Sequence, residues 1–149
     1  MVDVLSEIEI RRPRAEVAAY ASDPDNIRAW YENITAVEWR SEPPLGVGSQ
    51  LAFVAHFLGA RLEYVYEVEE LAPGERLVMR TADGPFEMQT TYEWTDAGDG
   101  ATRMTLRNRG EPARATKLAA RLIARSMRRA NRKDLRRLKQ ILEAPPAGQ

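Results

Sequence analysis

The chain reads FEMQTTYEW over residues 86–94, and its side chains alternate strictly along this stretch. Apolar or small side chains occupy the even positions, whereas polar side chains occupy the odd ones. Successive side chains of a β-strand point to opposite faces of its sheet. The alternation therefore predicts a strand with one buried and one solvated face, which is typical of an antiparallel sheet that covers a core on one side.

Further strand candidates surround this stretch, and turn residues separate them. Asp83-Gly84, just before it, is the strongest hairpin signal of the chain. The other separators are Leu58 to Ala60, Ala72 to Glu75 and Asp96 to Gly100. The pattern predicts a run of antiparallel strands over residues 49–57, 61–71, 76–82, 86–95 and 101–109.

The turns also predict which residues face each other across the strands. Two-residue turns at 73–74 and 83–84, with a symmetric loop over 96–100, place opposite charges side by side on the outer face. The row contains Glu67, Arg80, Glu87 and Arg109, while Glu93 faces Arg103 and Thr91 faces Thr105. Each pair of opposite charges stabilises a sheet by about 0.2–1 kcal/mol. The row mainly assigns the outer face, because a slip of one residue would turn these charges into the core.

Both ends of the chain add elements to this central run. Residues 2–11 alternate and predict a first strand. Short helices are expected over about 13–20 and 24–30, because Ser22-Asp23-Pro24 is typical of a helix start. Residues 34–40 predict one more strand, which brings the expected sheet to seven strands.

Residues 112–143 predict one long helix with two unlike faces, and Pro112 suits its first turn. Its apolar stripe is expected to contain Leu118, Leu122, Ile123, Met127, Ala130, Leu135, Leu138 and Ile141. Basic side chains fill most other positions. Residues 112–149 hold 11 Lys and Arg against 2 Asp and Glu, whereas residues 1–111 hold 11 against 20. An acidic body and a basic C-terminal segment are therefore expected beneath a formal net charge of zero.

Length and composition favour one globular domain. A chain of 149 residues has the usual length of a single domain, which we expect over residues 1–144, with a flexible tail over 145–149. The sequence contains no cysteine and a single histidine, His56, so that disulfides, thiolate metal sites, cysteine nucleophiles and paired-histidine zinc motifs are excluded. We expect neither a metal nor a cofactor. The lack of cysteine, of a long apolar run and of a leader-like start predicts a cytoplasmic protein.

The order of the expected elements resembles the helix-grip fold of the START/birch-allergen superfamily, and within it the bacterial polyketide cyclase/dehydrase-type SRPBCC proteins. The residues that carry the resemblance lie at 10–17 (IRRPRAEV), 23–30, 46–49 (GVGS), 64–73 and 100–105 (GATRMT). The resemblance spans about residues 2–142. It implies an α+β fold in which a curved seven-stranded antiparallel sheet wraps around the long C-terminal helix, with two short helices after the first strand. It also implies a cavity between sheet and helix.

Candidate ligand contacts follow from the inner positions of the strands, from the helix stripe and from the second short helix. They are Trp30, Tyr31, Phe53, Ala55, Phe57, Tyr64, Tyr66, Met79, Thr81, Met88, Thr90, Tyr92, Met104, Leu118 and Leu122. An apolar lining with a few polar groups is the usual form of a small-molecule site. The alternative is that these side chains fill a solid core. No catalytic residue is assigned.

The polar candidates also have alternative roles. Buried tyrosine hydroxyls need partners, so those of Tyr64, Tyr66 and Tyr92 either orient a ligand, act as weak acids or bind the backbone or neighbouring threonines. A tight turn at 59–60 places His56 opposite Glu63 on the outer face, which predicts a surface histidine. Asn108 is expected to point inward or to cap the end of its strand.

Three functions are compatible with these features. The first is binding of a hydrophobic or aromatic small molecule, lipid-like or polyketide-like, in the cavity. The second, which the resemblance implies, is a polyketide cyclase or aromatase that acts by holding its substrate folded, since proximity alone accelerates a reaction. The third is an interaction module in which the basic helix, over residues 114–139, contacts an anionic membrane surface or an acidic partner. Few aromatic residues interrupt the basic residues, which disfavours nucleic acid.

Overall fold

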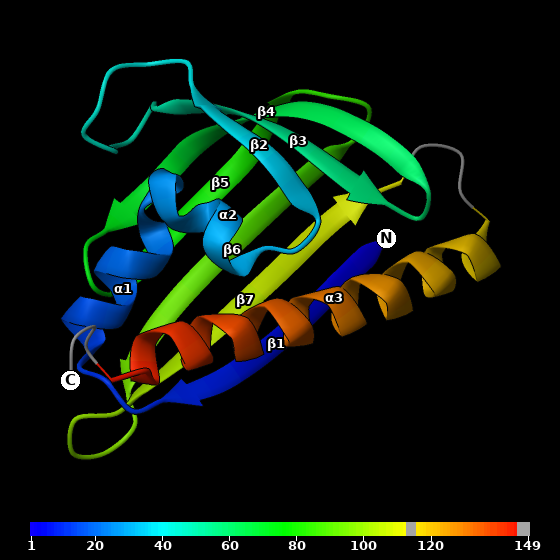
Figure 1. Ribbon diagram of the computed structural model, residues 1–149. Coiled ribbons are helices and arrows are strands. Elements are labelled where there is room, and N and C mark those ends of the chain that lie inside the picture. The colour runs from blue at the N-terminus through cyan, green and yellow to red at the C-terminus, as the bar shows by residue number, and fades with distance from the viewer. Residues whose placement is uncertain (113–115, 146–149) are drawn as a thin grey trace.

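Seven antiparallel strands and one long helix dominate the computed structural model, which describes residues 1–112 and 116–145 (Figure 1). The elements are β1 (Val2–Ile10), α1 (Arg14–Ser22), a short 3-10 turn (Pro24–Asn26), α2 (Ile27–Trp30), β2 (Ile34–Trp39), β3 (Gln50–Phe57), β4 (Ala60–Ala72), β5 (Arg76–Asp83), β6 (Glu87–Asp96), β7 (Thr102–Glu111) and α3 (Lys117–Glu143). The strand order is β1-β7-β6-β5-β4-β3-β2. The expected α+β helix-grip fold is confirmed, because Figure 1 shows the sheet curving over one side of α3.

The predicted assignment of strand faces is correct, but several predicted pairings are wrong. Glu67 does face Arg80, whereas Arg80 faces Gln89 instead of Glu87. On the last hairpin the observed pairs are Glu87–Glu111, Thr91–Arg107 and Glu93–Thr105. The cause is the position of the turns. The β6–β7 loop runs over 97–101, where the Ala97 N–H donates to the Ala101 carbonyl at 2.9 Å, one residue later than expected.

These shifts leave the outer face intact because they move the partner by two residues, and side chains alternate with a period of two. Some charges now meet diagonally: Arg80 Nε lies 3.1 Å from a carboxylate oxygen of Glu69, two residues from its direct partner Glu67. Others meet directly, since Arg76 faces Glu93 and lies 3.3 Å from its carboxylate. His56 likewise faces Arg61 rather than Glu63.

The long helix begins later than expected, and two of the eight residues of its predicted apolar stripe do not face inward. Lys117 is its first residue, and the Thr116 hydroxyl caps it by accepting from the Ala119 N–H at 3.0 Å. Leu118 and Leu122 are 68% and 55% exposed, so the prediction that they belong to the inward stripe is wrong. Successive residues turn by about 100° around a helix, and the inward side is instead set by residues near Met127 and Leu138. Its buried side chains are Asn131, Asp134, Leu135, Leu138 and Leu142.

The core lies at one end of the molecule, where α1, α2 and the C-terminal half of α3 cover the sheet (Figure 1). Its largest fully buried side chains include Trp30, Tyr92, Leu135 and Leu138. The tail expected over 145–149 falls, apart from Pro145, outside the described residues, and so does Arg114 of the basic segment. Because the core occupies one end, the sheet and α3 enclose space at the other.

Candidate functional site

A cavity of about 300 Å³ lies between the inner face of the sheet, α2 and α3. A single water needs only about 10–15 Å³ by the same kind of measure, so this space is far larger than a packing defect. Strands β3 to β7 supply most of its wall, and α3 closes it. The lining includes Phe53, Ala55, Phe57, Leu62, Tyr64, Tyr66, Met79, Thr81, Phe86, Met88, Thr90, Tyr92, Asn108, Ile123, Met127, Ala130, Asn131 and Asp134.

Most of the residues expected to contact a ligand line this cavity. They are Tyr31, Phe53, Ala55, Phe57, Tyr64, Tyr66, Met79, Thr81, Met88, Thr90 and Tyr92. Two others, Trp30 and Met104, are buried in the core and do not reach the lining. Leu118 and Leu122 lie on the exposed side of α3 and do not line it either. The expectation of a lining role is therefore wrong for these four residues.

Aromatic rings form one wall of the cavity. The ring of Phe53 stacks on that of Tyr64 with centroids 5.3 Å apart, and Tyr66 lies 5.0 Å from Tyr64 and 5.6 Å from Phe53. These separations are typical of favourable aromatic pairs, and the rings expose large apolar surface at little cost in conformational entropy. Such a wall suits an apolar or planar molecule.

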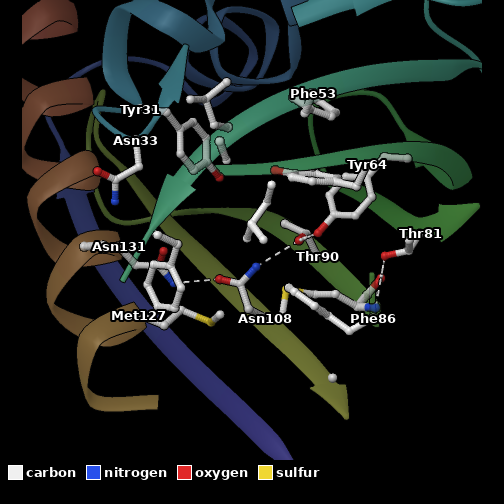
Figure 2. Close-up of a pocket in the computed structure, with 18 of the residues that line it drawn as sticks. Tyr31, Asn33, Phe53, Tyr64, Thr81, Phe86, Thr90, Asn108, Met127 and Asn131 are labelled. Carbon is white, nitrogen blue, oxygen red and sulfur yellow. Dashed lines mark hydrogen bonds between the residues drawn. The ribbon is translucent and has the colours of Figure 1, made fainter. Parts of the chain in front are cut away.

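A chain of hydrogen bonds crosses the cavity wall from the sheet to α3 (Figure 2). The Tyr66 hydroxyl lies 2.9 Å from Thr90 Oγ1, which accepts from Asn108 Nδ2 at 2.8 Å. The Asn108 carbonyl oxygen in turn accepts from Asn131 Nδ2 at 2.6 Å. Thr90, Asn108 and Asn131 are all buried. A connected polar network of this kind holds its members in fixed orientations. Asn108 therefore points inward, which was one of its two expected roles.

The remaining tyrosines differ in how their hydroxyls are bonded. The hydroxyls of Tyr31 and Tyr92 bond each other at 2.6 Å. The hydroxyl of Tyr64 forms no hydrogen bond within residues 1–112 and 116–145, and Figure 2 shows it directed into the pocket. Burial raises the pKa of Tyr66 to about 12, and it raises the pKa values of Tyr31, Tyr64 and Tyr92 as well. At neutral pH these side chains therefore act as neutral donors and acceptors.

Asp134 is the ionisable group that the sequence analysis missed. It is 3% exposed, lines the cavity and accepts a hydrogen bond from the Glu32 N–H through Oδ1 at 3.2 Å. Burial raises the pKa of Asp134 to about 6; the nearby Glu32 charge acts in the same direction, and the hydrogen bond from Glu32 and the charge of Lys133 oppose it. Its sequence position could have indicated that it faces inward. Asp134 follows Met127 by seven residues and Asn131 by three, which places all three on one side of the helix.

The predicted position of His56 can also be compared with the structure. His56 is exposed, as expected, and contributes to the rim of the cavity together with the exposed Leu58. Within the described ranges, no three His, Asp or Glu side chains are grouped so as to hold a metal ion. In the same ranges, no helix is both long and apolar enough to cross a membrane.

A protein-family model and several solved structures are similar to this chain. The family model described as polyketide cyclase/dehydrase and lipid transport matches residues 1–143. The structure of a START superfamily protein from Mycobacterium smegmatis is similar, with a TM-score of 0.81, 14% sequence identity and coverage of 95% of this chain and 97% of the other. The Zhui aromatase/cyclase from Streptomyces sp. R1128 is similar with a TM-score of 0.83, 15% identity and coverage of 98% and 97%.

A protein from Thermobifida fusca, determined in solution by NMR, also shares the fold, with a TM-score of 0.76, 20% identity and full coverage of both chains. At these identities the likeness concerns the fold. No curated protein matches the sequence.

Proposed function

Because the chain belongs to the polyketide cyclase/dehydrase and lipid transport family, we propose that its cavity binds an apolar or aromatic small molecule, lipid-like or polyketide-like. The observation that carries this proposal is the aromatic-walled cavity of about 300 Å³ between sheet and helix. Ligand sites are typically concave and mostly apolar, with a few polar groups that fix orientation. A cytoplasmic location is part of the proposal, since a chain without cysteine is compatible with a reducing compartment.

Binding in such a site needs no reactive group. Removal of apolar surface from water contributes roughly 25 cal/mol per Å², and the rings of Phe53, Tyr64 and Tyr66 offer that surface. The hydrogen-bonded chain from Tyr66 to Asn131 fixes the polar part of the wall before a ligand arrives. A wall that is already ordered adds little entropic cost to association.

The same cavity also suits a cyclase or aromatase that acts by holding a flexible chain in a reactive conformation, because proximity and orientation accelerate ring closure without a nucleophile. Two groups favour this second function. The Tyr64 hydroxyl, which has no hydrogen-bond partner among the described residues, points into the pocket (Figure 2), and Asp134 lines the same cavity. Binding is common to both functions, so the experiment below tests their shared premise.

Filling the cavity is expected to weaken ligand binding by about tenfold or more. Ala55 lines the cavity on β3, and the phenyl ring of Ala55→Phe would occupy space that a ligand needs. The matched control is Ala82→Phe, because Ala82 lies exposed on β5. Titration with the fluorescent apolar probe N-phenyl-1-naphthylamine measures the effect. A tenfold change corresponds to about 1.4 kcal/mol.

The wild type and Ala82→Phe should bind the probe with equal affinity. The proposal is contradicted if the wild type fails to bind the probe up to its solubility limit. It is contradicted equally if Ala55→Phe, shown to be folded by its thermal unfolding, binds as tightly as the control.

We propose a third function for the exposed face of α3, contact with an anionic membrane surface. Leu118 and Leu122 lie on this face. Exposed basic side chains lie beside them, including Arg121, Arg125 and Arg129. Among the described residues, the basic side chains of α3 that form ion pairs are Lys133, with Glu32, and Lys139, with Glu143. A helix that presents leucine between cationic side chains is typical of segments that bind the interface of an anionic bilayer.

Replacing both leucines by serine is expected to weaken association with vesicles of mixed phosphatidylserine and phosphatidylcholine several-fold, since each leucine loses its burial in the interface. Leu5→Ser is the control, because Leu5 is similarly exposed on β1. Vesicle co-sedimentation at low salt measures the effect, and added salt should weaken wild-type association. Absence of wild-type association at low salt would exclude the membrane function.

A further inference from the structure

Asp134 stands in the cavity wall with an acceptor that the protein itself leaves unused. Its Oδ1 accepts from the Glu32 N–H, whereas its other oxygen accepts no hydrogen bond from any residue that the structure describes. The side chain is buried and lines the cavity. Burial of a polar group without a partner is costly, and burial of a charged one is more so. An apolar ligand that covered this carboxylate would therefore bind more weakly, because it would bury the second oxygen without a hydrogen-bond donor.

The groups around Asp134 are already engaged with one another. Glu32, which precedes β2, pairs with Lys133 of α3 at 2.8 Å. The hydroxyls of Tyr31 and Tyr92, which face Asp134 from the end of α2 and from β6, are 2.6 Å apart and share a hydrogen bond. These are the ionisable neighbours that influence Asp134, and none of their side chains donates a hydrogen bond to it; Glu32 donates only through its backbone N–H. Among residues 1–112 and 116–145, therefore, no group donates to the second carboxylate oxygen, which is left for a donor that a ligand brings.

We infer that the ligand of this cavity carries a hydroxyl or phenol group on an apolar skeleton, and that Asp134 accepts the hydrogen bond from that group. This inference rests on the proposed function, because it concerns the ligand of the same cavity. It adds the chemical class of the ligand's polar group and the residue that selects it.

A neutral donor fits this position better than a cation or an acceptor. Asn131, one helical turn before Asp134, uses its Nδ2 on Asn108, and its carbonyl oxygen is a further acceptor. The polar part of α3 in the wall is thus rich in acceptors. A ligand with only acceptors would face these oxygens without a donor, and a cation would have to give up its hydration in a mostly apolar space. A hydroxyl satisfies an acceptor without burying a second charge.

The preference for a ligand that carries a hydroxyl should depend on pH. Whether each affinity rises or falls with pH follows from the protonation state of Asp134. A ligand without a donor displaces water from the carboxyl and disfavours its charged form, so that binding takes up a proton. The affinity of such a ligand falls as pH rises through the pKa of Asp134, which is about 6 in the free protein. A ligand with a hydroxyl bonds the charged form, and a charge-assisted hydrogen bond is the stronger kind. Its affinity holds or rises over the same range.

Two probes of nearly equal shape separate these outcomes. 2-Naphthol carries a donor, and 2-methoxynaphthalene does not; neither is charged between about pH 5 and about pH 8, the range in which Asp134 titrates. Calorimetric titration of the wild type at the two ends of this range measures its affinity for each probe. The expected preference for 2-naphthol is about tenfold at the higher pH and much smaller at the lower pH. The pH dependence requires no variant, so it stands even where a substitution impairs folding.

Variants assign the effect to one residue. Asp134→Asn keeps a carbonyl acceptor but loses the charge, and it is expected to remove the pH dependence of the preference. Asp99→Asn, in the exposed β6–β7 loop, controls for a change of net charge and should behave as the wild type.

The possible failures can be told apart. If both probes bind equally at both pH values, or if the preference is unchanged in Asp134→Asn, the inference is overturned while the proposed function stands. If neither probe binds at either pH and N-phenyl-1-naphthylamine also fails to bind, the proposed function is overturned and the inference with it.

Discussion

Replacing Trp30 by alanine is expected to lower the free energy of unfolding by about 3–5 kcal/mol, the usual cost of truncating a buried aromatic side chain. Trp30 is 1% exposed, and its ring lies 4.3 Å from that of Tyr31 and 5.8 Å from that of Tyr92. The substitution leaves a hole beneath the aromatic pair that borders the cavity. Urea unfolding followed by circular dichroism measures the change.

Trp30→Phe separates the stabilising contribution of aromatic packing from the desolvation cost of the indole nitrogen. Trp30 Nε1 is buried and has no hydrogen-bond partner among the residues described, and such a group carries a desolvation cost of about 1–3 kcal/mol. Its removal offsets part of the lost packing, so Trp30→Phe should cost far less than Trp30→Ala. A loss below about 1 kcal/mol for Trp30→Ala would mean that Trp30 borders open space, as the sequence analysis expected, and not the core.

Two leucines of α3 are expected to behave in opposite ways when each is replaced by alanine. Leu138 is 0% exposed, and Leu138→Ala should lower the free energy of unfolding by about 2–5 kcal/mol. Leu122 is exposed, and Leu122→Ala should change it by less than about 0.5 kcal/mol. The same unfolding measurement compares both variants with the wild type. Equal losses in the two variants would contradict the described orientation of the helix.

The sequence predicted the faces of the sheet well because alternation is a local property of each strand. Residues 86–94 show which side chains point inward without reference to any neighbour. Pairing is different, since it depends on where each turn closes. Arg80 faces Gln89 and not Glu87 because the connection from β5 to β6 is centred one residue later than the Asp83-Gly84 signal indicates. A shift of two residues in the partner preserves the face and changes only the contact.

The helix was harder to orient because its inward side is not uniformly apolar. The analysis counted every apolar residue toward one stripe, which drew in Leu118 and Leu122 and left out Asn131 and Asp134. The partners that make those two polar residues acceptable inside are Asn108 and the Glu32 N–H, both distant in sequence. Helical spacing alone carries no information about such partners.

The cavity itself lies beyond what a sequence pattern reports. Inner positions such as Phe53 and Tyr66 show the same alternating pattern in the sequence whether their side chains fill a core or line a cavity. Their arrangement depends on how strongly the sheet curves and on where the bulky side chains gather. Here Trp30, Leu135 and Leu138 gather at one end, and the aromatic wall is left facing open volume at the other.

The account rests on a ligand entering this cavity, and NMR mapping with N-phenyl-1-naphthylamine tests that claim most directly. Binding is expected to shift the side-chain amide signals of Asn108 and Asn131 together with the backbone amides near Phe53 and Tyr66, which line the cavity. Outer-face residues such as Arg80 should be unaffected. The account is contradicted if the shifts are confined to the exposed face of α3 around Leu118 and Leu122, or if none occurs up to the solubility of the probe.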